Sequence, residues 1–177
     1  MLVTVRHGET DYNLKRIYSG RNGWPRLTKE AHDLAYKVGK KLKQDNFDLA
    51  IVSPLTRTKE TFNEINKTLN IEYMTCEDIV ERDYKEYDGK SYDLLDYKNY
   101  WRLDLDGEFK IETIKEMIER VEKFLNEIRE KYHDKNVLIV SHSGVCRVIR
   151  YILTGKKEND LRDYKMDNLE VYKYEEW

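Results

Sequence analysis

Cysteine, proline, glycine and long apolar runs are all scarce in this chain of 177 residues. Its two cysteines, Cys76 and Cys146, cannot build a disulfide framework, so we expect a reducing compartment, the cytoplasm. No apolar run approaches the roughly 20 residues that a membrane-spanning helix needs. The first residues also lack the apolar stretch of a signal peptide. We therefore expect no membrane partner, and we exclude a secreted or collagen-like protein.

Net charge is scarce as well, because 32 Lys and Arg residues almost cancel 34 Asp and Glu residues and leave a net charge of −2. A chain without excess positive charge offers no argument for nucleic acid as its partner. Hydrophobic residues reach 40% and aromatic residues 12%, which argues against disorder. The length suits a single domain.

Short apolar runs alternate with longer amphipathic patterns. The runs at 2–5, 49–52 and 137–140 are rich in β-branched residues and stop at polar or turn residues. Such runs are typical of strands buried on both faces of a parallel sheet. Residues 169–174 are predicted to form a last strand.

The amphipathic patterns predict four helices. Thr28 is placed to cap the first helix, and the second follows Pro54. The third runs from about Thr113 to Tyr132 and opens with a capping box made by Thr113 and Glu116. The fourth runs from near Gly144 to near Gly155. The apolar face predicted for the first helix consists of Ala31, Leu34, Ala35, Val38 and Leu42.

This alternation predicts an α/β fold, namely a three-layer α/β/α sandwich with a mostly parallel sheet. The whole chain, 1–177, is expected to form one domain. Residues 84–110 interrupt the alternation and are crowded with Tyr, Trp and Asp. We predict that this segment is a small helical cap. Its aromatic residues either line a pocket or only pack the cap onto the domain.

Charged and imidazole side chains follow three of the predicted strands. Arg6 and His7 end the first strand, Arg57 comes shortly after the second, and His142 follows the 137–140 strand. The carboxyl ends of parallel strands meet at one edge of a sheet, so these four side chains are expected to converge.

Two arginines and two imidazoles suit a compact anion with several oxygens, above all a phosphoryl group, because guanidinium forks match phosphate geometry. Gly8 would let the backbone approach that anion. Gly144 would open a helix whose N-terminus points partial positive charge at it. The surrounding positive charge would keep one histidine unprotonated and able to attack phosphorus. Each residue alone would be unremarkable, and only their joint placement indicates catalysis.

Four motifs in order along the chain resemble those of the histidine phosphatase superfamily, also called phosphoglycerate mutase-like. The first is similar to R-H-G-x-T-x-x-N, the second to S-P-L-x-R-x-x-x-T, and the third to the stretch that begins with the acid/base carboxylate. The fourth is similar to S-H-G-G-x-x-R. These motifs are Arg6-His7-Gly8-Glu9-Thr10 with Asn13, Ser53-Pro54-Leu55-Thr56-Arg57 with Thr61, Glu81-Arg82-Asp83-Tyr84, and Ser141-His142-Ser143-Gly144 with Arg147. Ala31, Lys85 and Ser143 depart from the family pattern at positions where glycine is common.

The resemblance implies a role for each matching residue. His7 would be the phosphorylated nucleophile, and Arg6, Arg57 and His142 would hold the phosphoryl oxygens. Glu81 would protonate the leaving oxygen and later deprotonate the attacking water. Further substrate or phosphate contacts are expected from Gly8, Asn13, Ser19, Gly20, Arg82, Ser143 and Gly144. No metal ion and no other cofactor is expected.

Three functions remain open from the sequence: a phosphatase, a mutase that returns the phosphoryl group to its substrate, and a phosphate-binding domain with weak catalysis. Family mutases carry a longer insertion after the carboxylate, whereas the segment here is short and leans acidic, which favours hydrolysis. Arg82 is the one feature that favours a mutase. The expected partner is a small phosphomonoester such as a sugar phosphate, a phosphoglycerate or α-ribazole phosphate, and broad specificity is our default. A monomer or a homodimer is expected.

Overall fold

A computed structural model of the chain describes residues 1–21 and 24–177. Five strands form one sheet in the order β3-β2-β4-β1-β5. Neighbouring strands run parallel, except that β5 pairs antiparallel with β1. The strands are β1 (Leu2–Arg6), β2 (Leu49–Val52), β3 (Tyr73–Thr75), β4 (Val137–Ser141) and β5 (Val171–Tyr174).

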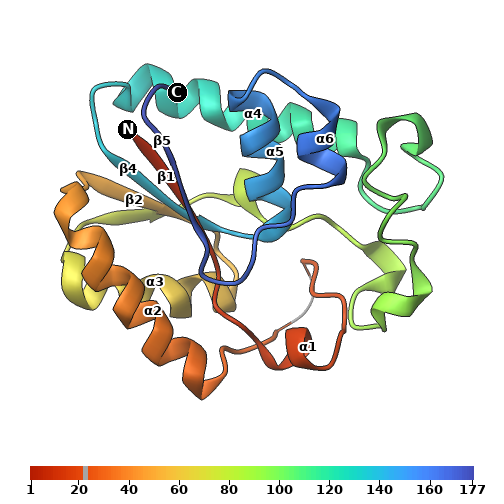
Figure 1. Cartoon of the computed structure of the whole chain (residues 1–177), viewed down its shortest axis with the longest axis horizontal. Coiled ribbons are helices and arrows are strands. Elements are labelled where there is room, and N and C mark those ends of the chain that lie inside the picture. The colour runs from red at the N-terminus through yellow and green to blue at the C-terminus, as the bar shows by residue number, and fades with distance from the viewer. Residues whose placement is uncertain (22–23) are drawn as a thin grey trace.

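Helices cover both faces of the sheet (Figure 1), which confirms the predicted three-layer sandwich. One face carries α2 and α3, and the other carries α4 and α5, with α6 beside α5. The helices are α1 (Asp11–Leu14), α2 (Lys29–Leu42), α3 (Thr56–Leu69), α4 (Ile114–Tyr132), α5 (Ser143–Leu153) and α6 (Glu158–Arg162). Within the described residues, no helix is long and apolar enough to cross a membrane.

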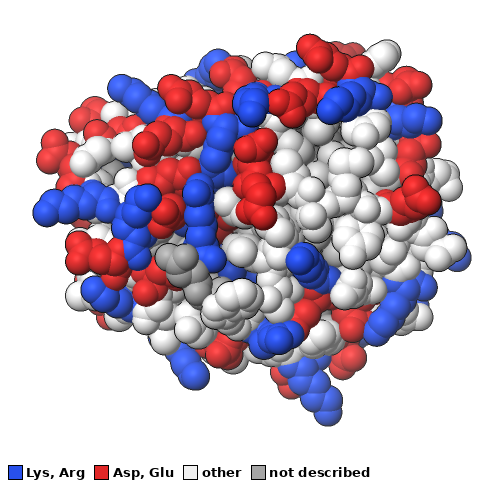
Figure 2. Space-filling view, turned by 180° about the vertical axis from the view of Figure 1, so that it is seen from behind, with Lys and Arg blue, Asp and Glu red and all other residues white. Residues whose placement is uncertain are grey.

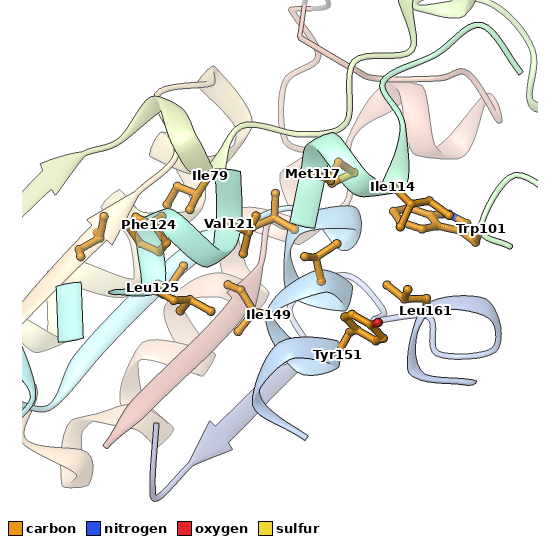
Figure 3. Packing of buried hydrophobic residues seen from close by; sticks show 14 of the residues in the cluster. Ile79, Trp101, Ile114, Met117, Val121, Phe124, Leu125, Ile149, Tyr151 and Leu161 are labelled. Carbon is orange, nitrogen blue, oxygen red and sulfur yellow. The ribbon is translucent and has the colours of Figure 1, made fainter. Parts of the chain in front are cut away.

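The central strands divide their side chains between two cores. In β4, Leu138 and Val140 pack in the cluster that includes α2 and α3 residues, whereas Val137 and Ile139 pack in the cluster with α4 and α5. Successive side chains of a strand point to opposite faces, so a strand covered on both sides is apolar throughout. Figure 3 shows the second cluster, in which residues of α4 and α5 pack together.

Two predicted helix starts are confirmed. The Thr28 hydroxyl accepts a hydrogen bond from the Ala31 amide at 3.1 Å, and Thr113 and Glu116 form a reciprocal capping box. The predicted apolar face of α2 is wrong at Leu34, which is 50% exposed. Gly39 is buried in that helix instead, because α2 lies close against α3 there.

The helical parts of the cap are short. Residues 84–110 contain no α-helix and form three 3-10 helices at 85–87, 92–94 and 103–105. Lys85 begins the first turn at a φ of 51°, a left-handed conformation that explains why glycine is common at this position. Its side chain is exposed and pairs with Asp83. The cap is nevertheless firmly packed, because Tyr100 and Trp101 are both 2% exposed and belong to the core cluster seen in Figure 3.

Replacing Gly39 by alanine tests the contact between α2 and α3. A Cβ at this position would lie 2.5 Å from the Ile65 carbonyl oxygen and 2.5 Å from Thr68 Oγ1. Helix propensity alone would make alanine stabilising by about 1 kcal/mol. We expect a net destabilisation of about 1–3 kcal/mol, because the helices must move apart. Urea unfolding would measure it, with exposed Lys37→Ala on the same helix as the control. A Gly39→Ala variant more stable than the parent would contradict the close packing.

Candidate active site

The carboxyl ends of β1, β2 and β4 bring the predicted catalytic residues together. Arg6 ends β1 opposite Ser141 of β4, and His7 follows with its amide bonded to the Ser141 carbonyl at 2.9 Å. Arg57 lies in the first turn of α3, and His142 is the residue before α5. The rings of His7 and His142 lie 5.3 Å apart between centroids.

The surroundings of His7 determine which of its nitrogens is free of a proton. Nδ1 lies 2.8 Å from the Gly8 carbonyl oxygen. A carbonyl only accepts, so Nδ1 donates and Nε2 keeps its lone pair in the neutral ring. Arg57 Nε donates to that Nε2 at 3.3 Å. The unprotonated nitrogen of His7 therefore lies directly against a guanidinium.

Both site histidines are held in the neutral form. Burial lowers the pKa of His7 well below 6.5, and the charges of Arg57 and Arg6 lower it further. Burial also lowers the pKa of His142 well below 6.5, and Arg57 adds to the effect. His142 Nε2 pairs with the Ser53 hydroxyl at 2.8 Å. The two imidazoles are thus uncharged near neutral pH.

Arg57 is deeply enclosed, at 1% exposed. Burial lowers its pKa to about 10, so it stays protonated at neutral pH. One terminal nitrogen donates to the carbonyls of Ser19 and Gly20 at 3.0 and 3.1 Å. Ser19 therefore contributes its carbonyl to orienting Arg57.

Several buried polar atoms of the site have no hydrogen-bond partner among the residues that the structure describes. They are the second terminal nitrogen of Arg57, Nε of Arg6, Nδ1 of His142 and the hydroxyl of Ser19. Buried polar atoms are nearly always paired, so these atoms are available to water or a ligand, and a tetrahedral oxyanion offers several acceptor oxygens. Arg6 and Ser19 line the cavity, whereas Arg57 and His142 are not among its lining residues.

Glu81 lies beside this group and is 6% exposed. One carboxylate oxygen accepts from the Arg82 amide at 2.8 Å, and the other from the Gly144 amide at 3.3 Å. Gly144 lines the cavity, and its amide binds a carboxylate of the protein; its expected contact with phosphate stays a prediction. A Cβ at position 144 would collide with the Glu81 carboxylate, which explains the glycine.

Three other residues expected to contact substrate have partners within the protein. The Gly8 amide donates to the Thr61 hydroxyl at 2.9 Å, and the Gly20 amide donates to Asp88 at 2.8 Å. Arg82 is 1% exposed and is not among the cavity-lining residues. Its guanidinium donates to the carbonyls of Glu112 and Tyr100 and lies over the Trp101 ring. Neither alternative from the sequence, a substrate contact or a solvated side chain, describes it.

The lining of the cavity includes Asn13, Ser19 and Ser143 as expected, together with residues that the sequence analysis missed. Asn13 Oδ1 caps the short helix α1 by accepting from the Thr10 amide at 3.0 Å. Asn168 donates to the His7 carbonyl at 3.0 Å and also lines the cavity. Only the antiparallel pairing of β5 with β1 would have indicated that Asn168 lies near His7, and the sequence pattern does not reveal this pairing. Arg147 and Lys165 are further lining residues that were not assigned.

The cavity above the histidines measures about 610 Å³. Cap aromatics line it and also pack into the core, so both interpretations from the sequence hold at once. Its rim mixes Glu9, Asp93 and Asp96 with Arg16, Lys98 and Lys165. The aromatic lining residues are Tyr18, Tyr84, Tyr92, Tyr97, Tyr100 and Trp101. Within the described residues, no three His, Cys, Asp or Glu side chains gather as a metal site.

The fold and the site together define an α/β domain with a group of buried arginines and histidines at its strand ends. The family model of the histidine phosphatase superfamily (branch 1) matches residues 2–176, and the chain belongs to this family. "Uncharacterized phosphatase PhoE" of Bacillus subtilis is 30% identical over 85% of this chain and 76% of its own length. A 2,3-bisphosphoglycerate-dependent phosphoglycerate mutase of Chelativorans sp. is also 30% identical, over 87% of this chain and 81% of its own.

Solved structures agree with the fold. Bacillus stearothermophilus YhfR superimposes with a TM-score of 0.85 over 96% of this chain and 88% of its own, at 22% identity. The relatives therefore include both phosphatases and mutases.

The lowered pKa values of His7 and His142 predict how stability depends on pH. Below pH 6.5 each histidine takes up a proton in the unfolded chain that it does not take up in the native protein. The free energy of unfolding should therefore fall with decreasing pH, by about 1.4 kcal/mol per pH unit for each histidine. Urea unfolding between pH 7 and about 5 would measure the slope. His7→Asn and His142→Asn should each lower the slope of the unfolding free energy against pH by the contribution of one proton. A slope that neither variant changes would contradict the conclusion that both rings are buried and neutral.

Proposed function

We propose that the protein hydrolyses small phosphomonoesters through a phosphohistidine on His7. One observation carries this: a buried, neutral imidazole whose unprotonated Nε2 faces Arg57, among donors that need an oxyanion. In the first step Nε2 attacks phosphorus, the bond from phosphorus to the ester oxygen breaks, and Glu81 protonates the leaving alcohol. In the second step water attacks phosphorus, Glu81 takes its proton, and the bond between phosphorus and Nε2 breaks.

The chain's own cations supply the electrostatic stabilisation that this chemistry needs. Charge spreads over three phosphoryl oxygens in the transition state. Arg6 and Arg57 are permanently charged, and both are fixed before the substrate arrives. Arg57 is fixed by its bonds to two backbone carbonyls. Neutral His142 can donate one further hydrogen bond. We therefore propose a mechanism without a metal ion or another cofactor.

Hydrolysis is favoured over return of the phosphoryl group to a substrate. A mutase must retain a doubly phosphorylated intermediate, which requires further cations facing the cavity. Arg82 favoured a mutase in the sequence, yet its guanidinium is bonded to two backbone carbonyls outside the cavity lining. Four further cations, Arg16, Lys98, Arg147 and Lys165, do line the cavity, but four carboxylates, Glu9, Asp93, Asp96 and Asp167, line it with them. The cavity therefore offers little net positive charge for a second phosphate.

The walls of the cavity support a preference for the leaving group. Tyrosine and tryptophan rings offer flat apolar surface and little net charge to a substrate. We propose that a leaving alcohol with an uncharged ring is accepted better than one with a carboxylate, within an otherwise broad specificity.

We also propose that the protein acts in the cytoplasm and does not bind nucleic acid. The two cysteines are unpaired, as is usual in the cytoplasm. Charges of both signs are interspersed on the face seen in Figure 2, around a broad uncharged area, which does not favour nucleic acid. The choice between a monomer and a homodimer stays a prediction.

Phosphate release tests the proposed reaction. The protein would be incubated with phosphoglycerates, with and without 2,3-bisphosphoglycerate, and with a panel of phosphomonoesters, while phosphate release and isomerisation are both followed. We expect phosphate release to dominate and His7→Ala to lose at least about a hundredfold of the activity, since the nucleophile is gone. His133→Ala, at an exposed helix end, is the control. Faster isomerisation would establish a mutase, and the absence of both reactions would establish a binding domain.

Esters with equally poor leaving groups test the role of the aromatic walls. Benzyl phosphate and glycerol phosphate both release alkyl alcohols, so kcat/KM should differ mainly through contacts with the ring. We expect benzyl phosphate to be favoured at least tenfold over glycerol phosphate and 3-phosphoglycerate, as about 1.4 kcal/mol of ring contact would give. Tyr97→Ala should reduce the preference, and Tyr36→Ala on α2 should not. Equal rates on all three esters would refute the preference.

A further inference from the structure

We propose that Glu112 is a positioning residue that fixes the acid/base carboxylate of Glu81 by way of two arginines. This proposal rests on the proposed function, in which Glu81 transfers the protons. Glu112 lies where the chain leaves the cap and enters α4, and it is 7% exposed. It is not among the residues that line the cavity.

The Glu112 carboxylate is bound by charged donors on two sides. Arg21 donates to it at 2.8 Å, and Arg120 of α4 donates through two nitrogens at 2.7 and 3.1 Å. The Asp83 amide adds a bond at 2.9 Å. Charge-assisted bonds of this kind are short and directional, so the two guanidinium groups are held in fixed places.

Both arginines reach from Glu112 to the backbone of Glu81. Arg21 Nε donates to the Glu81 carbonyl at 3.1 Å, and Arg120 donates to the same oxygen at 3.5 Å. A third nitrogen of Arg120 donates at 2.6 Å to the carbonyl of Asp78, which lies shortly before Glu81 in the chain. One buried carboxylate thus orients two cations that together hold the peptide of the acid/base residue.

The residues after Glu81 are held as well. The Glu112 amide donates to the Asp83 carbonyl at 2.8 Å, which complements the bond from the Asp83 amide to the carboxylate. The Arg82 amide between these points donates to Glu81 Oε1 at 2.8 Å. Because residues 81–83 are fixed at both ends, the direction of the Glu81 carboxylate is set before a substrate binds.

Loss of the Glu112 charge should disturb proton transfer more than the other steps. Without it, two buried or half-buried cations lose their shared anion and move, and the Glu81 peptide moves with them. Arg6, Arg57 and His7 are held by other contacts, with Met166, Ser19, Gly20 and Gly8. The attack on phosphorus should therefore be largely spared.

The leaving group separates these two effects. The good leaving group of p-nitrophenyl phosphate departs without a proton, whereas the alcohol of benzyl phosphate needs one from Glu81. Glu112→Gln should lower kcat/KM about 10- to 100-fold on benzyl phosphate and less than about threefold on p-nitrophenyl phosphate. The parameter kcat/KM is used because it ends at release of the alcohol and omits the later attack by water.

Two reference variants complete the experiment. Glu81→Gln should show the same dependence on the leaving group more strongly, and Glu119→Gln, exposed on α4, should show none. If Glu81→Gln affects both substrates equally, the proposed acid is wrong. If Glu81→Gln depends on the leaving group and Glu112→Gln does not, the positioning role is wrong. Thermal unfolding monitors folding, and if Glu112→Gln does not fold, Arg120→Lys carries the same test and the same two outcomes.

Discussion

The contact between Arg57 and His7 is the interaction on which the rest of the site depends. It places a full positive charge, 1% exposed, against the nitrogen that must remain unprotonated. Burial of such a charge is costly unless its donors are satisfied. The loop at Ser19 and Gly20 supplies two carbonyls for this purpose, and the remaining nitrogen is left for an oxyanion. The same arrangement thus adds to the burial that keeps His7 neutral, holds the loop, and supplies a charge for the phosphoryl group that we propose as substrate.

The sequence predicted the parts of the molecule that are decided locally. The strands at 49–52 and 137–140 and the caps at Thr28 and Thr113 follow from patterns within a few residues, and so does the placement of His7 and Arg57 at strand ends. The strand β3 has three residues, all exposed, and is too short to give an alternating pattern.

Other features depend on contacts between residues far apart in the chain. Arg82 donates to carbonyls 18 and 30 positions away, so its direction cannot be read from its neighbours in sequence. The amide of Gly144 donates to the carboxylate of Glu81, 63 positions earlier in the chain. The motif alone would assign this amide to phosphate. The cap was expected to be helical because it interrupts the alternation of strands and helices and is rich in Tyr, Trp and Asp. Its helices are short 3-10 helices, and its order comes from Tyr100 and Trp101, which enter the core.

The segment just before β5 has a consequence for the order in which the site forms during folding. Arg6 donates to the Met166 carbonyl 160 positions away, and Asn168 holds the carbonyl of His7. Contacts between residues so far apart in the chain form late, because a long loop must close before they contribute. The geometry around His7 is therefore expected to be among the last parts of the fold to become ordered, after the helices that local patterns decide.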